Sequence, residues 1–403
     1  MASKNAQSSV ETPINVDAFI NGGGPVGLIL ALGLAKQNRQ VVLVEKSVPK
    51  QGPSFDGRVL ALSYGSRLVL EQLGIWQQLE PFTTEISDIH VSQKGFMGVT
   101  HLHAKEVKVP ALGYSVTAYD LGQVLWQIAS EESHIQLFTE CSLASFEQQD
   151  SGVSVAIQCQ KKEIEHHHFH AKLLVGADGT YSKVREILGL PLEENDYGAF
   201  GFIAKIETEL EPNGWAFERF TSEGPVALLP MGGAFHKAVM VVPNDKREAV
   251  AALDDRSFMA LFSEKMGERL GRFVSISDRV AYPLKETYVP EMVQGRVVLM
   301  GNASHTQHPV AAQGLNLGIS DIQTFLSMMD DVEDLGDDTV LQQYQTEQQA
   351  HHQKIMGFTD GLIQVFQAPS SVVGHMRGIG LMAMEAMPNL RKRLSRMAMG
   401  LAK

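Results

Sequence analysis

The pattern of apolar and polar positions divides the chain into segments of different periodicity. Short apolar runs typical of buried strands occur near the N-terminus, near residue 175 and again near residue 298. Between residues 200 and 242, apolar runs alternate with Gly and Pro turns, which is typical of an antiparallel sheet. The antiparallel stretch thus lies between the buried strands near residues 175 and 298. We therefore expect a cofactor domain in separated segments with a substrate domain inserted.

The predicted fold is therefore α/β, with a discontinuous Rossmann-like cofactor domain, an inserted antiparallel-sheet domain and a helical C-terminal segment. This order does not allow the two domains to be separated by one cut in the sequence. We assign 16–80, 113–190 and 280–330 to the cofactor domain, 81–112 and 191–279 to the substrate domain, 331–403 to the helical region, and 1–15 to a disordered N-terminus.

The first 45 residues predict a strand–loop–helix–strand unit. A strand over 16–21 runs into Gly22-Gly23-Gly24-Pro25-Val26-Gly27, and an apolar helix follows from Pro25 to about Gln37. The first glycine permits a tight turn, the second lets backbone approach a pyrophosphate, and the third lets the helix pack closely. The helix N-terminus attracts the anion. A second strand over 40–44 ends at Glu45, where an acid can accept hydrogen bonds from ribose hydroxyls.

Three residues are predicted to mark helix ends. Asn38 can end the first helix because asparagine tolerates the left-handed conformation. Asp120 is the expected N-cap of an amphipathic helix over 120–131. Pro388 is expected to divide the C-terminal segment into two short helices, since proline breaks a helix interior.

Composition and charge narrow the function classes. The chain has 403 residues, of which 44% are hydrophobic and 20% charged, and its formal net charge is −12. An acidic chain repels phosphate backbones, so we expect no nucleic-acid partner. We find no apolar signal core and no run near the about 20 residues that a membrane span needs. We expect a cytoplasmic protein, and we leave open a peripheral contact with the inner membrane.

Other polar clusters have simpler interpretations than a metal site, and we predict no metal. His166, His168 and His170 would share one side of a strand, but no carboxylate or Cys partner accompanies them, so a solvated strand is favoured. The pair His351-His352 is expected on a helix surface, and the acidic stretch 330–338 is expected to be a solvated loop. The two cysteines, Cys141 and Cys159, are expected to be buried spectators in a protein of a reducing compartment.

Further motifs make the cofactor more specific. A strand ends in Gly176-Ala177-Asp178-Gly179, and another ends in Gly301-Asn302-Ala303-Ser304-His305, followed by His308-Pro309 and Gln313-Gly314-Leu315-Asn316-Leu317-Gly318. On these motifs the chain resembles the FAD-dependent ubiquinone-biosynthesis hydroxylases, within the wider class of single-component flavoprotein aromatic hydroxylases. The resemblance extends over nearly the whole chain from Val16. It rests also on the stretches 56–66, 216–221, 224–231 and 296–321.

The resemblance implies roles for individual residues. Gly22, Gly24 and Gly27 would hold the FAD pyrophosphate, and Glu45 the adenosine ribose. Asp178 would serve both FAD and the nicotinamide donor. The other implied cofactor-binding residues are Arg58, Gln123, Asn302, Pro309, Gly314, Leu315 and Asn316. His308 is a candidate catalytic base, by its place beside the flavin motif. Two positions depart from the family pattern, Asn302 where the class has Asp and Ala312 where it has Gly.

The reaction implied is hydroxylation of the aromatic ring of a polyprenyl phenol in ubiquinone biosynthesis. It would use dioxygen and NADPH or NADH as electron donor, through a flavin hydroperoxide. Aromatic residues of the insert could supply apolar wall for the prenyl chain, although we expect most of them to belong to the core: Phe200, Phe202, Trp215, Phe217 and Phe220. Two alternatives stay open, a hydroxylase of a small soluble aromatic and a flavin reductase or dehydrogenase without oxygen insertion.

The C-terminal segment differs in charge from the rest of the chain. Residues 361–403 contain six basic residues, one acidic residue and six of the 17 methionines. Apolar positions (Met376, Ile379, Met382, Leu390, Leu394 and Met397) alternate there with Arg391, Lys392, Arg393 and Arg396. Such a tail could lie on an anionic membrane or dock on partner enzymes of the same pathway. The alternative, that its apolar side packs on the protein's own core, stays equally open.

Overall fold

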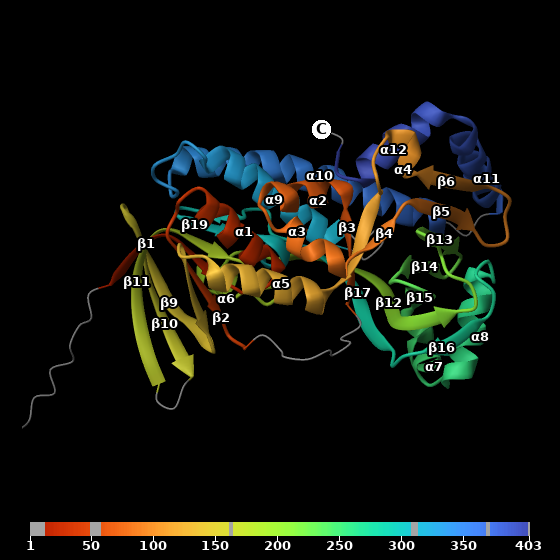
Figure 1. Cartoon of the computed structure of the whole chain (residues 1–403), viewed down its shortest axis with the longest axis horizontal. Coiled ribbons are helices and arrows are strands. Elements are labelled where there is room, and N and C mark those ends of the chain that lie inside the picture. The colour runs from red at the N-terminus through yellow and green to blue at the C-terminus, as the bar shows by residue number, and fades with distance from the viewer. Residues whose placement is uncertain (1–12, 49–57, 161–163, 308–312, 368–370, 402–403) are drawn as a thin grey trace, which may run out of the picture.

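The computed structural model describes residues 13–48, 58–160, 164–307, 313–367 and 371–401. A large parallel sheet with its helices forms one half of the molecule, and a nine-stranded, mainly antiparallel sheet forms the other (Figure 1). A small three-stranded sheet lies at the junction between them. The predicted fold class is confirmed.

The first half is built on five parallel strands that carry an antiparallel extension. The parallel strands run in the spatial order β19, β11, β1, β2, β8, so the first strand of the chain lies at the centre. β11 is long enough to pair with β1 at its C-terminal part and with β10 at its N-terminal part. The strands of this sheet are β1 (Ile14–Asn21), β2 (Val41–Glu45), β8 (Ile135–Thr139), β9 (Cys141–Gln149), β10 (Gly152–Gln160), β11 (Ile164–Gly176), β18 (Val293–Gln294) and β19 (Val297–Leu299).

The second half combines strands from distant parts of the chain. β5 and β6 join its edge through a parallel pairing of β5 with β13, and β20 joins the opposite edge. β17, which begins at residue 280, pairs with β12 in this sheet, although the sequence division places it in the cofactor domain. The strands are β5 (Asp88–Gln93), β6 (Val99–His103), β12 (Glu193–Thr208), β13 (Trp215–Thr221), β14 (Gly224–Pro230), β15 (Phe235–Pro243), β16 (Phe273–Ile276), β17 (Val280–Tyr288) and β20 (His305–Thr306).

The three-stranded sheet links the two halves by hydrogen bonds. It consists of β3 (Val59–Ser63), β7 (Gly113–Thr117) and β4 (Thr84–Ile86). The Lys237 amine of β15 donates to the Val59 carbonyl of β3 at 2.6 Å, and the Ser115 hydroxyl of β7 donates to the Pro230 carbonyl of β14. β3 therefore lies between the cofactor half and the antiparallel sheet.

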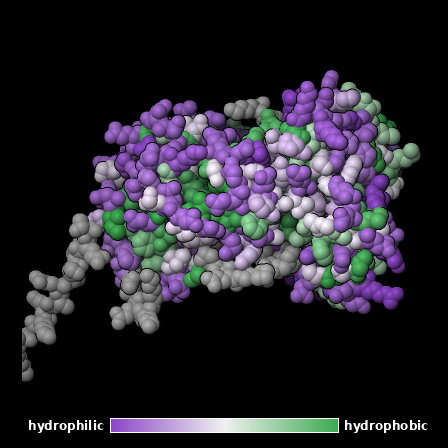
Figure 2. Space-filling model, viewed as in Figure 1, coloured by the Kyte–Doolittle hydropathy of each residue, from purple (hydrophilic) through white to green (hydrophobic). Residues whose placement is uncertain are grey.

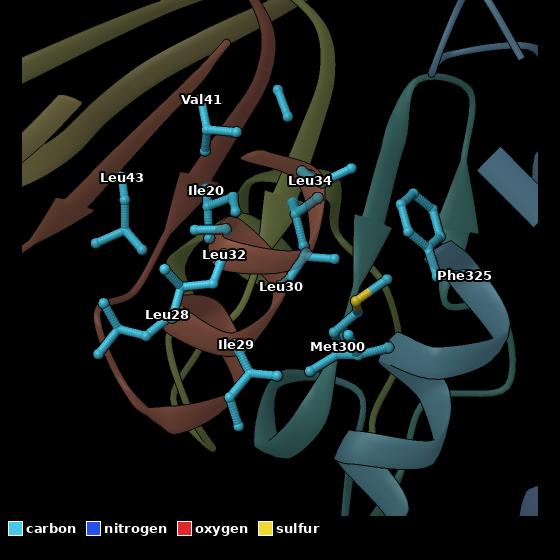
Figure 3. Packing of buried hydrophobic residues seen from close by; sticks show 14 of the residues in the cluster. Ile20, Leu28, Ile29, Leu30, Leu32, Leu34, Val41, Leu43, Met300 and Phe325 are labelled. Atoms are coloured by element: carbon cyan, nitrogen blue, oxygen red, sulfur yellow. The ribbon is translucent and has the colours of Figure 1, made fainter. Parts of the chain in front are cut away.

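Helices cover the parallel sheet and bury its apolar strands. α1 is buried over most of its length because it contacts the sheet, α5 and α9 together. Figure 3 shows its leucines between Ile20, Val41 and Leu43 on one side and Met300 and Phe325 on the other. The longer helices are α1 (Pro25–Lys36), α2 (Tyr64–Gln72), α5 (Ala118–Glu131), α8 (Asp255–Met266), α9 (Gln313–Met329), α10 (Asp338–Gln367), α11 (Ser371–Ala386) and α12 (Pro388–Ala398). The short ones are α3 (Trp76–Leu79), η1 (Glu80–Phe82), α4 (Ala104–Val107), α6 (Lys183–Leu188), η2 (Asn244–Lys246), α7 (Arg247–Ala251) and η3 (Gly301–Ala303).

The helix ends show where local rules held and where they failed. Asn38 has φ 58° after α1, and Pro388 begins α12, so both predictions are confirmed. The predicted N-cap Asp120 is wrong. α5 begins two residues earlier, and the Thr117 hydroxyl accepts from the Asp120 N–H at 3.0 Å. Threonine is also a good N-cap, and the strand before it delivers Thr117 to that position.

The two cysteines are buried as expected, but they are not separate spectators. Cys141 and Cys159 lie directly opposite each other on β9 and β10 and form a disulfide. Cross-strand register brought them together, and the sequence separation of 18 residues gave no sign of it.

Candidate functional site

The glycine loop between β1 and α1 is held in a tight turn. Gly22 has φ 119°, and its N–H donates to the Val44 carbonyl at 2.8 Å. A Cβ atom on Gly22 would collide with the Ala177 carbonyl, and one on Gly27 would collide with the Gly22 carbonyl. Both positions therefore need glycine because neighbouring backbone lies against them.

Gly24 differs from these two because no atom of the described chain lies within 4 Å of a Cβ built on it. It is the N-cap of α1, and Pro25 occupies the first helical position. The first N–H groups of a helix have no partner within the helix, and they favour an anion. The loop thus offers room and partial positive charge at the same point.

Glu45 lies at the end of β2, next to this loop. One carboxylate oxygen accepts from the Gly23 N–H at 2.8 Å, and the other accepts from the Ser47 hydroxyl at 2.8 Å. The side chain therefore lies beside the turn. The hydroxyls of a ribose joined to a pyrophosphate at α1 could donate to this carboxylate in place of the Gly23 N–H and the Ser47 hydroxyl.

Asp178 follows β11, the strand next to β1, so its carboxylate meets the same edge of the sheet. Its Oδ2 atom accepts from the Asn21 amide at 2.8 Å and from the Lys183 N–H at the start of α6 at 2.7 Å. Its Oδ1 atom is buried and has no partner among the described residues. An unpaired buried carboxylate oxygen is costly, which points to a donor on a bound group.

The third segment at this edge follows β19. Gly301 has φ 58° and packs against Val26 of α1, where a Cβ would be 2.9 Å from a Val26 methyl. Asn302 is exposed next to it, so its amide is open to a ligand. Segments from three distant parts of the chain therefore meet at the carboxyl ends of β1, β11 and β19, as the sequence order predicts.

The first turn of α9 is tied to β3. The Asn316 side chain accepts from the Ser63 N–H at 2.8 Å and from the Ser66 hydroxyl at 2.8 Å, and donates to the Ala61 carbonyl at 2.8 Å. This amide therefore fixes the helix N-terminus against β3. Among the described residues, nothing outside this helix lies within 4 Å of a Cβ built on Gly314, two residues before Asn316.

The remaining predicted site residues lie in different settings. Leu315 is half-buried against the core, Arg58 is exposed immediately before β3, and Gln123 is half-buried in α5. His308, Pro309 and the departure Ala312 lie outside the described residues.

A buried cluster next to the site was not foreseen. Asp321 of α9 accepts from the Nε2 atoms of His305 and His352, each at 2.8 Å, and all three side chains are at most 1% exposed. The surface position predicted for His352 is therefore wrong, because α10 turns this residue toward α9. In the sequence, the one pattern that points to this cluster is the position of His305 and Asp321 on either side of the Gly314 motif.

Charge pairing determines the protonation in this cluster. Burial alone would raise the pKa of Asp321, but the two histidines outweigh it and hold that pKa well below its usual range. Burial lowers the pKa of His305, against the opposing effect of Asp321. The nitrogen and oxygen atoms lie within 4.8 Å of one another, as in a metal site. The hydrogen bonds already join the atoms that a cation would need, and burial favours a neutral His305 beside the ionised Asp321.

Two other predicted surface features differ in detail. His166 and His168 are exposed on β11, as a solvated strand requires. The acidic loop is not wholly solvated, because Asp334 forms a bidentate ion pair with Arg296 at 2.8 and 2.9 Å. That pair holds the loop against the start of β19.

The two faces of the antiparallel sheet have different roles. Phe202 and Phe217 point to the face that α8 covers, together with Phe258 and Met240, so they belong to a closed core. The opposite face carries Lys237, Val239, Leu229, Glu218 and Lys205, all of them half-buried. Most of the aromatic residues named as possible substrate wall thus belong to the core, as expected, since strand alternation turns them away from the second face.

The pKa values of two ionisable side chains on this second face are strongly perturbed, and no sequence pattern selects these residues. Burial raises the pKa of Glu218 to about 8 and lowers the pKa of Lys237 to about 8. Among the described residues Glu218 has no hydrogen-bond partner, and Lys237 bonds only the Val59 carbonyl. Groups that are perturbed by burial and lack structural partners are candidates for chemistry.

The C-terminal helices are partly structural. Arg391 is 8% exposed and forms a bidentate pair with Glu106, whose Oε2 atom is 2.8 Å from the Arg391 Nε atom. Its guanidinium also reaches Glu385 at 3.4 Å. The tail is thereby anchored to α4, while Lys392, Arg393 and Arg396 stay exposed.

Comparison with known proteins agrees with this geometry. A family model described as "FAD binding domain" matches residues 15–359. A ubiquinone hydroxylase of Rhodospirillum rubrum is 29% identical over 96% of this chain and 90% of its own length. The 3-demethoxyubiquinol 3-hydroxylase of Escherichia coli is 29% identical, over 95% and 98% of the two chains. The structure of p-nitrophenol 4-monooxygenase from Pseudomonas putida superposes with a TM-score of 0.78 over 95% of this chain and 97% of that one, at 14% identity.

Proposed function

We propose that this chain, which belongs to the FAD binding domain family, hydroxylates the aromatic ring of a polyprenyl phenol in ubiquinone biosynthesis. The observation that carries the proposal is the meeting of the Gly22 loop, Asp178 and the Gly301–Asn302 turn at one sheet edge. The ubiquinone hydroxylases that resemble the chain over nearly their full length support the substrate class.

FAD fits the residues present. The space at Gly24 and the N-terminus of α1 suit its pyrophosphate, and Glu45 suits the adenosine ribose. The unpaired Asp178 oxygen and the exposed Asn302 amide suit hydroxyls of the chain between phosphate and flavin. Arg58, Gln123, Gly314, Leu315 and Asn316 complete the proposed FAD-binding set, with Pro309 as a further member. His308 is a candidate catalytic base and not part of this set.

When bound and reduced, FAD supplies the electrons that activate dioxygen. The protein's own part is to exclude water and to position the ring. The N-terminus of α9, fixed against β3 by Asn316, would offer its partial positive charge to the bound cofactor. The half-buried face of the antiparallel sheet closes the other side, because Lys237 and Ser115 tie it to β3 and β7.

NADPH or NADH is the proposed electron donor, with Asp178 near its approach. The alternatives are a hydroxylase of a small soluble aromatic and a reductase that inserts no oxygen. The half-buried apolar residues Leu229 and Val239 beside Lys237 favour an aromatic substrate over a purely redox role.

Contact with an anionic membrane is proposed for the tail. Exposed apolar side chains gather on α11 and on the β5–β6 turn: Met376 at 65%, Ile379 at 60%, Met382 at 43% and Met97 at 80%. Figure 2 shows green, apolar surface along the edge that α11 occupies in Figure 1. Among the described residues, no helix is both long and apolar enough to cross a membrane.

Labelled dioxygen tests the reaction. The purified holoenzyme is incubated with NADPH or NADH, a prenylated phenol and isotopically labelled dioxygen, and the product is analysed by mass spectrometry. We expect one labelled oxygen on the ring. Label from water would contradict the mechanism, and donor oxidation that phenol does not stimulate would indicate a reductase.

A further inference from the structure

One face of the antiparallel sheet turns toward the cofactor half. On this face the lysine Lys237 lies beside β3. Lys237 of β15 lies opposite Leu229 of β14 and Lys205 of β12. Its amine donates to the Val59 carbonyl at 2.6 Å and has no other partner among the described residues. An ammonium has three donors, so two of its hydrogens are available to a ligand.

This amine lies close to the first turn of α9. The Val59 carbonyl is two residues along β3 from the Ala61 carbonyl, which accepts from Asn316. At a strand rise of roughly 3.3 Å per residue, the two carbonyls are about 7 Å apart along β3. Lys237 therefore lies where the antiparallel sheet meets β3 and the first turn of α9, next to the proposed flavin site.

The surroundings of Lys237 suit an aromatic ring. Leu229 and Val239, next to it on the same face, are half-buried, whereas the other face of the sheet is closed by α8. Glu218 bounds the face on β13, and register places its Cα atom roughly 12 Å from that of Lys237, two strands and two residues away. The small side chain of Ala227 lies opposite Glu218 on β14, so the face between the two ionisable groups is apolar.

We propose that Lys237 is a catalytic residue that accepts the proton of the substrate's phenol group and holds the resulting phenolate. This inference rests on the proposed phenol-hydroxylase function. The phenolic O–H bond breaks, its electron pair stays on oxygen, and the proton forms a new N–H bond on the neutral amine, which becomes ammonium. The phenolate makes the ring a better nucleophile toward an electrophilic oxygen.

The protonation state of Lys237 is compatible with this step. Burial lowers the pKa of Lys237 to about 8, so a fraction of the side chain is neutral amine near neutral pH. The charged groups of the surrounding elements are Arg58 before β3, Glu85 on β4, Lys205 on β12 and Glu218 on β13. A phenol of pKa about 10 loses its proton more readily when an ammonium forms beside its oxygen.

The bound phenol itself gives the test. The ultraviolet difference spectrum of 2-prenylphenol, titrated with pH in the presence of the holoenzyme, reports the pKa of the bound phenol. We expect the wild-type protein to lower this pKa by one unit or more, which is a tenfold or larger shift toward phenolate. Lys237→Gln keeps a donor for Val59 but removes the base, so we expect the shift to be lost and the hydroxylation rate to fall at least tenfold with FAD retained.

The matched control is Lys205→Gln. Lys205 lies opposite Lys237 on the same face, but its amine sits over the Phe235 ring, 3.8 Å from the ring centroid. We expect this variant to keep the shift. An unchanged phenol pKa in Lys237→Gln, or an equal loss in Lys205→Gln, would overturn the proposal.

A third variant covers the case in which Lys237→Gln fails to hold FAD. Lys237→Arg keeps both the positive charge and a donor for Val59 but cannot accept a proton. We therefore expect retained FAD, a phenol pKa that the charge still lowers, and a hydroxylation rate that falls as in Lys237→Gln. If this variant also loses FAD, Lys237 only joins the sheets and the proposal fails. If the wild-type protein does not bind 2-prenylphenol at all, the proposed function fails first, and the two failures are distinguishable.

Discussion

The buried carboxylate of Asp321 and the imidazole of His305 join the middle of α9 to the segment that follows Asn302. Their hydrogen bond is 2.8 Å long, and both side chains are at most 1% exposed. His352 of α10 bonds the other carboxylate oxygen. One aspartate thus connects α9, α10 and the loop at the proposed flavin site.

Removing this carboxylate should be costly. Asp321→Ala leaves two buried imidazoles without their partner, and we expect the free energy of unfolding to fall by about 3 kcal/mol or more. Urea denaturation measures it, with the exposed Asp331→Ala as the matched control. Because His305 follows the Gly301–Asn302 turn, FAD release should also be faster in Asp321→Ala. Equal stability of the two variants would show that the cluster contributes nothing.

Gly24→Val should remove FAD without unfolding the protein. No atom of the described chain would meet the new Cβ, but the side chain would fill the space proposed for the pyrophosphate. The expected result is loss of flavin absorbance with an unchanged circular dichroism spectrum. Gly27→Val is the contrasting variant, since its Cβ would collide with the Gly22 carbonyl, and it should lose the fold as well. Full FAD occupancy in Gly24→Val would contradict the proposed binding mode.

His236 should make stability depend on pH. Burial lowers the pKa of this fully buried histidine to about 4, whereas the unfolded chain binds a proton near pH 6.5. Between these two values the unfolded state holds more protons, so stability should fall as the pH drops from 6.5 toward 4, by about 3 kcal/mol from this group.

The variant His236→Gln isolates that contribution. Denaturation at a series of pH values should show a shallower slope in this variant than in the wild-type protein. His168→Gln, at an exposed position on β11, should leave the slope unchanged. A wild-type slope in His236→Gln would mean that other groups titrate in this window.

The basic residues of the tail should bind anionic vesicles. Replacing Lys392, Arg393 and Arg396 by Gln should weaken binding by about 1 kcal/mol per residue at low ionic strength, with FAD content unchanged. Arg391 is left intact because its pair with Glu106 is structural. The matched control replaces three lysines of α6, η2 and β17, of which the first two are exposed and the third half-buried: Lys183, Lys246 and Lys285. Equal binding by both variants would exclude the tail as the docking surface.

The sequence by itself determined the local units and their order. Gly22, Gly24, Gly27 and Glu45 stand at a fixed spacing between two apolar strands, and that spacing specifies a strand–loop–helix unit wherever it folds. The separated cofactor segments followed from the order of strand types along the chain. The same local rules located Asn38 and Pro388, because the backbone preferences of these residues act over one turn.

Tertiary structure decided which residues from distant strands and helices lie next to one another. Register opposed Cys141 to Cys159, strand alternation turned Phe217 toward α8 and Lys237 toward β3, and helix docking buried His352 against Asp321. These relationships join residues far apart in sequence. In the strands, a one-residue slip of register would turn each side chain to the other face. The perturbed pKa values of Lys237 and Glu218 arise from burial, which no local pattern encodes.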